Sequence, residues 1–114
     1  MSVKLTSRQV GDVTVLDAAG RITLGEGASL FRDMIRDLAV KGNKKILLNL
    51  ADVSYIDSSG IGEMVSGFTT ITNGGGKLKL LGLNKRVKDL LQITKLYTVF
   101  DAYEDEAAAV RSFS

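Results

Sequence analysis

Ile46-Leu47-Leu48-Asn49-Leu50 is an apolar run that predicts a buried strand, and a short turn over residues 51–56 follows it. The chain then continues as Asp57-Ser58-Ser59-Gly60. After this junction, apolar residues return at the spacing of a helix, at Ile61, Met64, Val65, Phe68 and Ile71. The stretch therefore predicts two serine hydroxyls at a helix N-terminus, at the carboxyl end of a strand. Backbone N–H groups and the helix dipole favour a phosphate at such a place.

Upstream of this stretch the sequence predicts a hairpin and a helix. Val3–Val10 and Val13–Ala18 predict two strands that turn at Gly11-Asp12. A glycine-bearing loop spans residues 20–27, and the helix after it has one apolar face, made of Leu30, Phe31, Met34, Ile35 and Leu38. Gly42-Asn43 ends that helix, because both residue types tolerate the left-handed conformation.

Downstream, helices and strands keep alternating. Asn73-Gly74-Gly75-Gly76 ends the second helix, and Lys77–Leu81 alternates charged with apolar residues, which predicts a strand with one solvated face. Asn84 is a good N-cap for a third helix, Tyr97–Phe100 predicts a short last strand, and acidic residues 104–106 precede a final helix. The order β-β-α-β-α-β-α-β-α predicts an α/β fold. We expect a small mixed sheet with a parallel core, an antiparallel N-terminal hairpin and helices mainly on one face.

The composition limits the chemistry that this chain can do alone. Its 114 residues predict a single domain over residues 1–114. With no cysteine and no histidine, the chain has no thiolate nucleophile, no serine–histidine pair and no histidine-containing zinc site. General acid–base catalysis near neutral pH would fall to carboxylates or lysines with strongly shifted pKa values. Apart from that route, we expect a protein that is not an enzyme and that holds neither a metal nor another cofactor.

Charge and hydropathy bear on partners and location. The net charge of +2 comes from lysines and arginines spread along the chain, whereas a nucleic-acid-binding protein usually gathers them in a stripe. No apolar run approaches the roughly 20 residues of a membrane span, and the N-terminus lacks the apolar stretch of a secretory signal. We expect a cytoplasmic protein that binds neither nucleic acid nor membrane.

Two glycine-rich stretches resemble phosphate-binding motifs but fail their patterns. Gly74-Gly75-Gly76-Lys77 lacks the earlier glycine and the following Ser or Thr of a phosphate-binding loop, and it follows a helix instead of opening one. Gly25-Glu26-Gly27 starts like a dinucleotide fingerprint, but Leu30 occupies the third glycine position. We interpret the first as a helix stop with a turn, and the second as a flexible loop that opens a helix.

Charged residues provide two further candidates, each with an ordinary explanation. Lys85, Arg86 and Lys88 form a basic first turn, which is either a solvated face or a docking patch for an acidic partner surface. Asp52 and Asp57 could hold a hard cation through carboxylate oxygens, although turn hydrogen bonding accounts for Asp52.

The Asp57 junction has a structural and a regulatory interpretation. Asp and Ser are favoured N-caps, and glycine lets a strand turn sharply into a helix. Alternatively, the junction is a phosphorylation switch, in which a phosphate adds about −1.5 to −2 charges. Within the chain, a gain of about 0.3–1 kcal/mol from the helix dipole offsets the repulsion from Asp57, so the fold should survive modification. The effect would then fall on an interface, where burying an unmatched dianion is costly.

The residues from Leu48 to Gly62, Leu-Asn-Leu-Ala-Asp-Val-Ser-Tyr-Ile-Asp-Ser-Ser-Gly-Ile-Gly, resemble the signature of the STAS domain of bacterial anti-sigma factor antagonists. The resemblance extends to the Gly20-Arg21-Ile22 loop, the Gly74-Gly75-Gly76 turn and the late segment over residues 90–96. It covers essentially the whole chain, and it implies a small sheet with helices largely on one side.

The resemblance implies a cytoplasmic partner-switching protein. In that family the unphosphorylated antagonist binds an anti-sigma factor, usually an ATP-dependent serine kinase, and this frees a sigma factor for transcription. The kinase phosphorylates the serine after the motif's aspartate, the complex separates, and a phosphatase resets it. That serine corresponds to Ser58, with Ser59 as the second candidate. ATP and magnesium would belong to the kinase, and we expect this chain to be a monomer.

The residues expected at the partner contact lie in the junction and in the loop before it: Asp57, Ser58, Ser59, Gly60, Gly62 and Thr23. Gly60 and Gly62 would keep the surface low enough for a kinase to approach. Thr23 would form the neighbouring rim, where antagonists of this family often carry an aspartate. The rim of this chain therefore differs from the family pattern by one carboxylate.

Two other functions stay open at this point. One is a scaffold subunit of a larger STAS stress-sensing assembly, in which phosphorylation is secondary; a large particle in size-exclusion chromatography would favour it. The other is a small-ligand or nucleotide-binding STAS domain that uses the crevice at the strand ends. Calorimetry with nucleotides and anions tests this second alternative.

Overall fold

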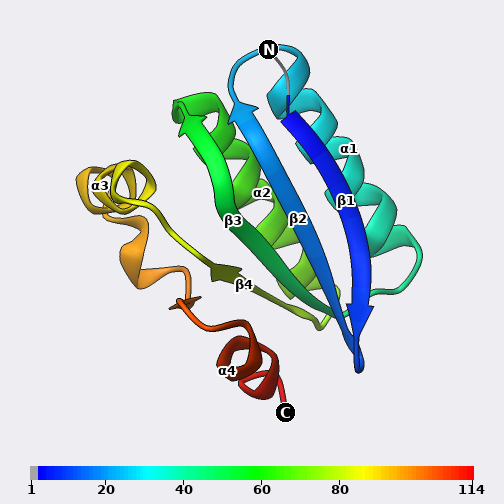
Figure 1. The fold of residues 1–114 in the computed structure, drawn as a ribbon. Coiled ribbons are helices and arrows are strands. Elements are labelled where there is room, and N and C mark those ends of the chain that lie inside the picture. Colours follow the sequence, from blue (N-terminus) through cyan, green and yellow to red (C-terminus); the bar gives the residue numbers. More distant parts are fainter. Residues whose placement is uncertain (1–2) are drawn as a thin grey trace.

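A five-stranded sheet forms the centre of the molecule (Figure 1). The computed structural model describes residues 3–114, so residues 1 and 2 of the predicted domain lie outside the described part. The strands lie side by side in chain order: β1 (Val3–Val10), β2 (Val13–Ile22), β3 (Lys45–Ile56), β4 (Lys77–Leu81) and β5 (Ala102–Tyr103). β1 is antiparallel to β2, and the other neighbouring strands are parallel, which confirms the predicted mixed sheet.

One face of the sheet is covered by helices, as predicted. α1 (Glu26–Val40) and α2 (Ser58–Asn73) pack against each other behind the sheet in the view of Figure 1. α3 (Lys85–Ile93) adds Val87 and Leu91 to the same core. Within residues 3–114, no helix has both the length and the apolarity needed to cross a membrane.

The apolar face predicted for α1 is confirmed except at its edge. Phe31, Ile35 and Leu38 are buried, and Met34 packs partly buried against the core. Leu30 is exposed instead. The buried residues follow the helical repeat, so α1 is held mainly by this apolar stripe.

A fourth helix, α4 (Glu106–Arg111), covers part of the opposite face. The prediction that Lys77 and Lys79 share a solvated face is therefore wrong for Lys79, which is buried. Its Nζ donates to the carbonyl oxygen of Ser112 at 2.9 Å and to the Ser112 Oγ at 3.0 Å. Lys79 is covered by a short helix from the distant end of the sequence, so the alternation of residues within β4 could not predict its burial.

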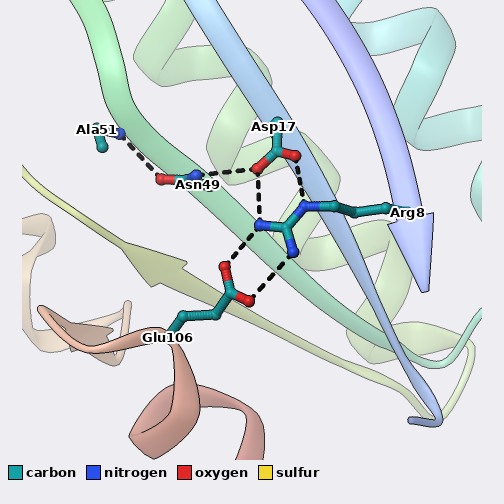
Figure 2. A network of polar contacts seen from close by, with 5 residues as sticks. All are labelled: Arg8, Asp17, Asn49, Ala51 and Glu106. Carbon is teal, nitrogen blue, oxygen red and sulfur yellow. Dashed lines mark hydrogen bonds and ion pairs between the residues drawn. The ribbon is translucent and has the colours of Figure 1, made fainter. Parts of the chain in front are cut away.

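An ion network fastens α4 to the N-terminal hairpin (Figure 2). Arg8 on β1 pairs with Asp17 on β2, with Nε and Oδ2 2.6 Å apart, and with Glu106, with Nη2 and Oε1 2.6 Å apart. Asn49 on β3 donates to Asp17 Oδ1 at 2.9 Å. The network therefore joins three neighbouring strands to the start of α4.

β2 and β3 are longer than predicted. The turn expected over residues 51–56 is strand, and β2 continues to Ile22, so Arg21 pairs with Tyr55 and Ile22 with Ile56. At two register shifts β3 has one residue more than β2, and the two strands stay paired through this polar stretch. Both strands consequently end at the same edge of the sheet, where α2 begins.

The last strand lies later in the chain than predicted. Tyr97–Phe100 is not a strand: Leu96–Thr98 is a short 3-10 helix, and β5 is Ala102–Tyr103. Phe100 is buried and packs edge-on against Phe68, with ring centroids 5.4 Å apart. Its apolar neighbourhood therefore reflects core filling, which a short apolar run does not distinguish from a strand.

Candidate functional site

Asp57 joins two loops at the carboxyl edge of the sheet. It is the N-cap of α2, and its Oδ1 accepts the backbone N–H of Gly60 at 2.9 Å. Its Oδ2 accepts the backbone N–H of Leu24, also at 2.9 Å. The backbone N–H of Asp57 donates to the carbonyl oxygen of Ile22 at 3.3 Å. One residue therefore fixes the start of α2 against the loop between β2 and α1.

Burial and hydrogen bonding act in opposite directions on the Asp57 carboxyl. Burial raises its pKa, but the backbone N–H groups of Leu24, Gly60 and Ser59 lower it, and the pKa of Asp57 lies below its ordinary value. The carboxylate is therefore ionised at neutral pH and already engaged by backbone donors. It serves as an anchor for the junction.

The two candidate serines differ in exposure. Ser58 is exposed at the first position of α2, whereas Ser59 is only partly exposed. A modifying enzyme needs access to the hydroxyl, so the geometry favours Ser58 over Ser59.

Gly60 and Gly62 have different surroundings although both lie at the start of α2. Gly60 is buried, and a Cβ there would lie 2.3 Å from the carbonyl oxygen of Ile22 and 2.6 Å from Cγ1 of Ile56. Gly62 is exposed, and an added Cβ would meet nothing within 4 Å. Only Gly62 therefore lies on the surface expected for the partner, while Gly60 lets α2 start close against β2 and β3.

Thr23 lies on the loop beside the junction, where the rim was predicted. It is partly exposed, and its carbonyl oxygen accepts the backbone N–H of Ala28 at 2.9 Å. The next residue, Leu24, is tied to Asp57 through its backbone, yet its side chain is 80% exposed. The rim thus presents an exposed apolar side chain on a residue whose backbone is bound to Asp57, directly before Ser58 in the sequence.

A groove of about 710 Å³ extends from Ser58 to α3. Tyr55, Asp57 and Ser58, from the end of β3 and the start of α2, line it together with Arg86, Leu90 and Ile93 of α3. The Ile93 side chain is 78% exposed. The groove combines a hydroxyl, a guanidinium and exposed apolar groups, which is the mixed chemistry of a protein contact.

The cation site considered for Asp52 and Asp57 is not assembled. Asp57 uses both carboxylate oxygens on backbone N–H groups, and Asp52 lines a different hollow, beside Arg8 and Asn49. Among residues 3–114 there is no cluster of three or more metal-ligating side chains of the His, Cys, Asp or Glu type.

The two glycine-rich stretches have the structural roles predicted for them. Gly74 is the C-cap of α2, and residues 74–76 lead directly into β4. Gly25 is the N-cap of α1, on the loop that reaches the junction through Leu24. The first stretch follows a helix and opens a strand, whereas the second opens α1 but has Leu30 at the third glycine position of the dinucleotide fingerprint.

Reasoning from the sequence missed a cation–π cluster of one tyrosine and two arginines beside the junction. Tyr55 lies within cation–π distance of two guanidiniums, with its ring centroid 4.0 Å from Cζ of Arg86 and 4.9 Å from Cζ of Arg21. Arg21 lies beside Tyr55 because β2 pairs with β3, and a longer predicted β3 would have indicated this position. Arg86 comes from α3, and no sequence signal places it there.

The chain is similar to a described protein family along most of its length. A family model of the STAS domain matches residues 4–109. The anti-sigma-B factor antagonist of Bacillus subtilis (strain 168) is 33% identical over 101 residues, which covers 89% of this chain and 91% of that protein.

Solved structures have the same fold. A crystal structure of a Thermotoga maritima protein matches with a TM-score of 0.89 and 30% identity, and covers 96% of this chain and 93% of that one. The Bacillus cell fate determinant SpoIIAA in its phosphorylated form matches with a TM-score of 0.74 and 20% identity, and covers 96% of this chain and 99% of that one. At this lower identity the second match concerns the fold alone.

Proposed function

This chain belongs to the STAS domain family, and on that premise we propose that it is an anti-sigma factor antagonist controlled by phosphorylation of Ser58. The name of the Bacillus subtilis relative supports the class of partner. In this proposal the chain is a regulatory binding protein and not an enzyme.

The exposed hydroxyl of Ser58 at the first position of α2 is the observation that carries the proposal. The preceding Asp57 is already bound to backbone N–H groups, so a phosphate would add its charge to a framework that is fixed. The helix dipole would contribute about 0.3–1 kcal/mol in favour of that charge. We therefore expect the fold to persist and the change to act at the surface.

Exposed apolar side chains flank Ser58 and suit a protein partner. Leu24 lies on the rim and Ile93 lies across the groove, with exposed fractions of 80% and 78%. A partner that covers both would enclose Ser58 between them. Enclosing a dianion without a matched cation costs on the order of several kcal/mol. Since about 1.4 kcal/mol is a tenfold change in affinity, one phosphate could release a partner held with micromolar affinity.

The proposed switch has two states. The unphosphorylated chain binds the anti-sigma factor, and a sigma factor is freed for transcription. The anti-sigma factor acts as a kinase: Ser58 Oγ forms a bond to the γ-phosphorus of ATP, the bond from that phosphorus to the bridging oxygen breaks, and ADP leaves. The hydroxyl proton passes to a base of the kinase. A phosphatase later hydrolyses the phosphate ester. ATP and magnesium are bound by the kinase and not by this chain, and the switch operates in the cytoplasm.

Affinity capture with matched variants tests this function. Wild type, Ser58→Ala and Ser58→Asp are used as bait, and captured proteins are identified by mass spectrometry. We expect wild type and Ser58→Ala to capture an anti-sigma factor with a kinase-type ATP site, and Ser58→Asp to lose it. With the purified partner and ATP, wild type and Ser59→Ala should each gain one phosphoryl group, and Ser58→Ala none. Equal capture by all three baits would refute the switch at Ser58.

A further inference from the structure

The basic first turn of α3 contains two paired cations and one free one. Lys85 pairs with Asp89, with Nζ and Oδ2 2.8 Å apart, and Lys88 pairs with Glu104, with Nζ and Oε1 3.3 Å apart. Arg86 has no carboxylate partner among residues 3–114. The charge of this turn that is available to a new anion is therefore that of Arg86.

Tyr55 holds the Arg86 guanidinium beside the junction. The Cζ atom of Arg86 lies 4.0 Å from the centroid of the Tyr55 ring, and Tyr55 lies near the end of β3, two residues before Asp57. A guanidinium that stacks on a ring keeps the N–H groups at its edge free for hydrogen bonds. These donors match the spacing of two oxygens of a phosphate.

Ser58 of α2 and Arg86 of α3 line the same groove. The other charged residues that line it are Asp57, Lys85 and Asp89. Asp57 is engaged by backbone N–H groups, and Asp89 and Lys85 engage each other. A phosphate on Ser58 would therefore find one cation in the groove without a partner.

Building on the proposed phosphorylation of Ser58, we propose that Arg86 binds the phosphoryl group of phosphoserine 58 within the same molecule. Its guanidinium donates two N–H groups to two phosphate oxygens across the groove, and Tyr55 remains its platform. This pair bridges the groove between α2 and α3. It also removes the free guanidinium from the surface that faces the anti-sigma factor, so phosphorylation withdraws a cation as well as adding an anion.

A phosphorus NMR titration tests the pair. The protein carries phosphoserine at position 58, incorporated by genetic code expansion. The second pKa of a phosphoserine is about 6, and a bound guanidinium favours the dianion. We expect this pKa to be about one unit lower in the wild type than in Arg86→Gln, which corresponds to a tenfold weaker affinity for the proton. Arg21→Gln is the matched control, because Arg21 also stacks on Tyr55 but does not line the groove. It should leave the pKa close to that of the wild type.

The Arg86 Nε–H resonance of the wild-type chain provides a second measurement that needs no variant. We expect it to shift when Ser58 carries the phosphate and to return when a phosphatase removes it. Equal phosphate pKa values in wild type and Arg86→Gln, or an unchanged Arg86 resonance, would overturn the pair. Because the phosphoserine is installed without a kinase, these results are independent of the capture experiment. Capture can fail while the pair is present, and the pair can be absent while capture succeeds.

Discussion

Asp57 and Gly60 together determine how α2 leaves the sheet. The carboxylate of Asp57 accepts N–H groups from both loops at this edge, and Gly60 sits where a side chain would collide with Ile22 and Ile56. The reach of an N-cap is short, so this arrangement requires the helix to start close to the strands. Ser58 lies between these two residues and is the one that faces outward.

Replacement of Asp57 by alanine should destabilise the fold. The variant loses the N-cap and the bond to Leu24, and the loss of an N-cap costs about 0.5–2 kcal/mol in the free energy of unfolding. Asp57→Asn should lose less, because the amide oxygen still accepts one of the two N–H groups. Urea unfolding measures both, and Asp52→Asn, at an exposed position, should stay within about 0.5 kcal/mol of wild type. A large loss of stability for the Asp52 variant and none for the Asp57 variants would contradict the role of Asp57 as the N-cap of α2.

Substitution by alanine should change the stability in opposite directions at the two glycines. Gly60→Ala places a Cβ 2.3 Å from a backbone oxygen, which cannot move away easily. We therefore expect the free energy of unfolding to fall by about 1–3 kcal/mol. Gly62→Ala meets open space inside a helix and should gain up to about 1 kcal/mol. Thermal unfolding distinguishes them. Similar melting temperatures for the two variants would show that the close approach at Gly60 is absent in solution.

At the scale of elements, α4 is too short to be stable alone, and polar contacts with other parts of the chain help to hold it in place. Asp105 caps it by accepting the N–H of Ala108 at 2.9 Å, and Arg8 binds Glu106 from β1. Lys79 donates to Ser112 just beyond its end. A helix of six residues would not be stable alone, so its position depends on these partners.

Acid should weaken the attachment of α4. Hydrogen bonds from Arg8 hold the pKa of Asp17 and of Glu106 below their ordinary values of 3.8 and 4.5. The folded chain therefore binds these protons less readily than the unfolded chain, so this stabilisation is complete above those values and is lost as the pH falls below them. Because the pairs are partly exposed, we expect about 1 kcal/mol or less from each.

Unfolding measured as a function of pH checks this expectation against Arg8→Gln. The variant should show a smaller loss of stability in acid, while Asp12 and Asp57 titrate equally in both proteins. Parallel pH curves for the two proteins would mean that Arg8 does not hold these carboxyls in solution.

Sequence reasoning succeeded where local pattern and topology agree. The hairpin, the apolar stripe of α1 and the caps at Asp57 and Asn84 depend on neighbouring residues, and the structure contains them. It failed where distant segments decide the outcome. Lys79 is buried by a helix from the far end of the chain, and Phe100 fills the core without forming a strand.

The candidate site divides along the same line. Residues adjacent in sequence, from Asp57 to Gly62, could be placed at the start of a helix from the motif alone. The inward position of Gly60 and the stacking of Arg86 on Tyr55 depend on contacts between elements, which one sequence does not reveal.

At the scale of the whole molecule, exposed apolar side chains occur at both ends of the sheet. Leu24 is bound through its backbone to Asp57 and Ile93 lines the groove with Ser58, whereas Val40, which is 87% exposed, ends α1 at the opposite edge. Single exposed apolar residues are common, so their position relative to Ser58 is what makes two of them candidates for the partner contact.

Serine substitutions separate these positions. Leu24→Ser and Ile93→Ser should each weaken anti-sigma factor binding about tenfold or more, because burying a large apolar side chain contributes roughly 1.5–3 kcal/mol. Val40→Ser should leave the affinity unchanged. Surface plasmon resonance measures the dissociation constants, and equal losses at all three positions would place the contact elsewhere.

Gly62 lies one helical turn after Ser58, so the two share a face of α2, and the missing side chain leaves bare backbone beside the hydroxyl. A side chain added there would stabilise the helix against heat, and it would also stand in the approach path of the proposed kinase. Stability and access to Ser58 are thus opposed at a single position. Under the proposed switch, a variant selected only for heat resistance would tend to lose its response to phosphorylation.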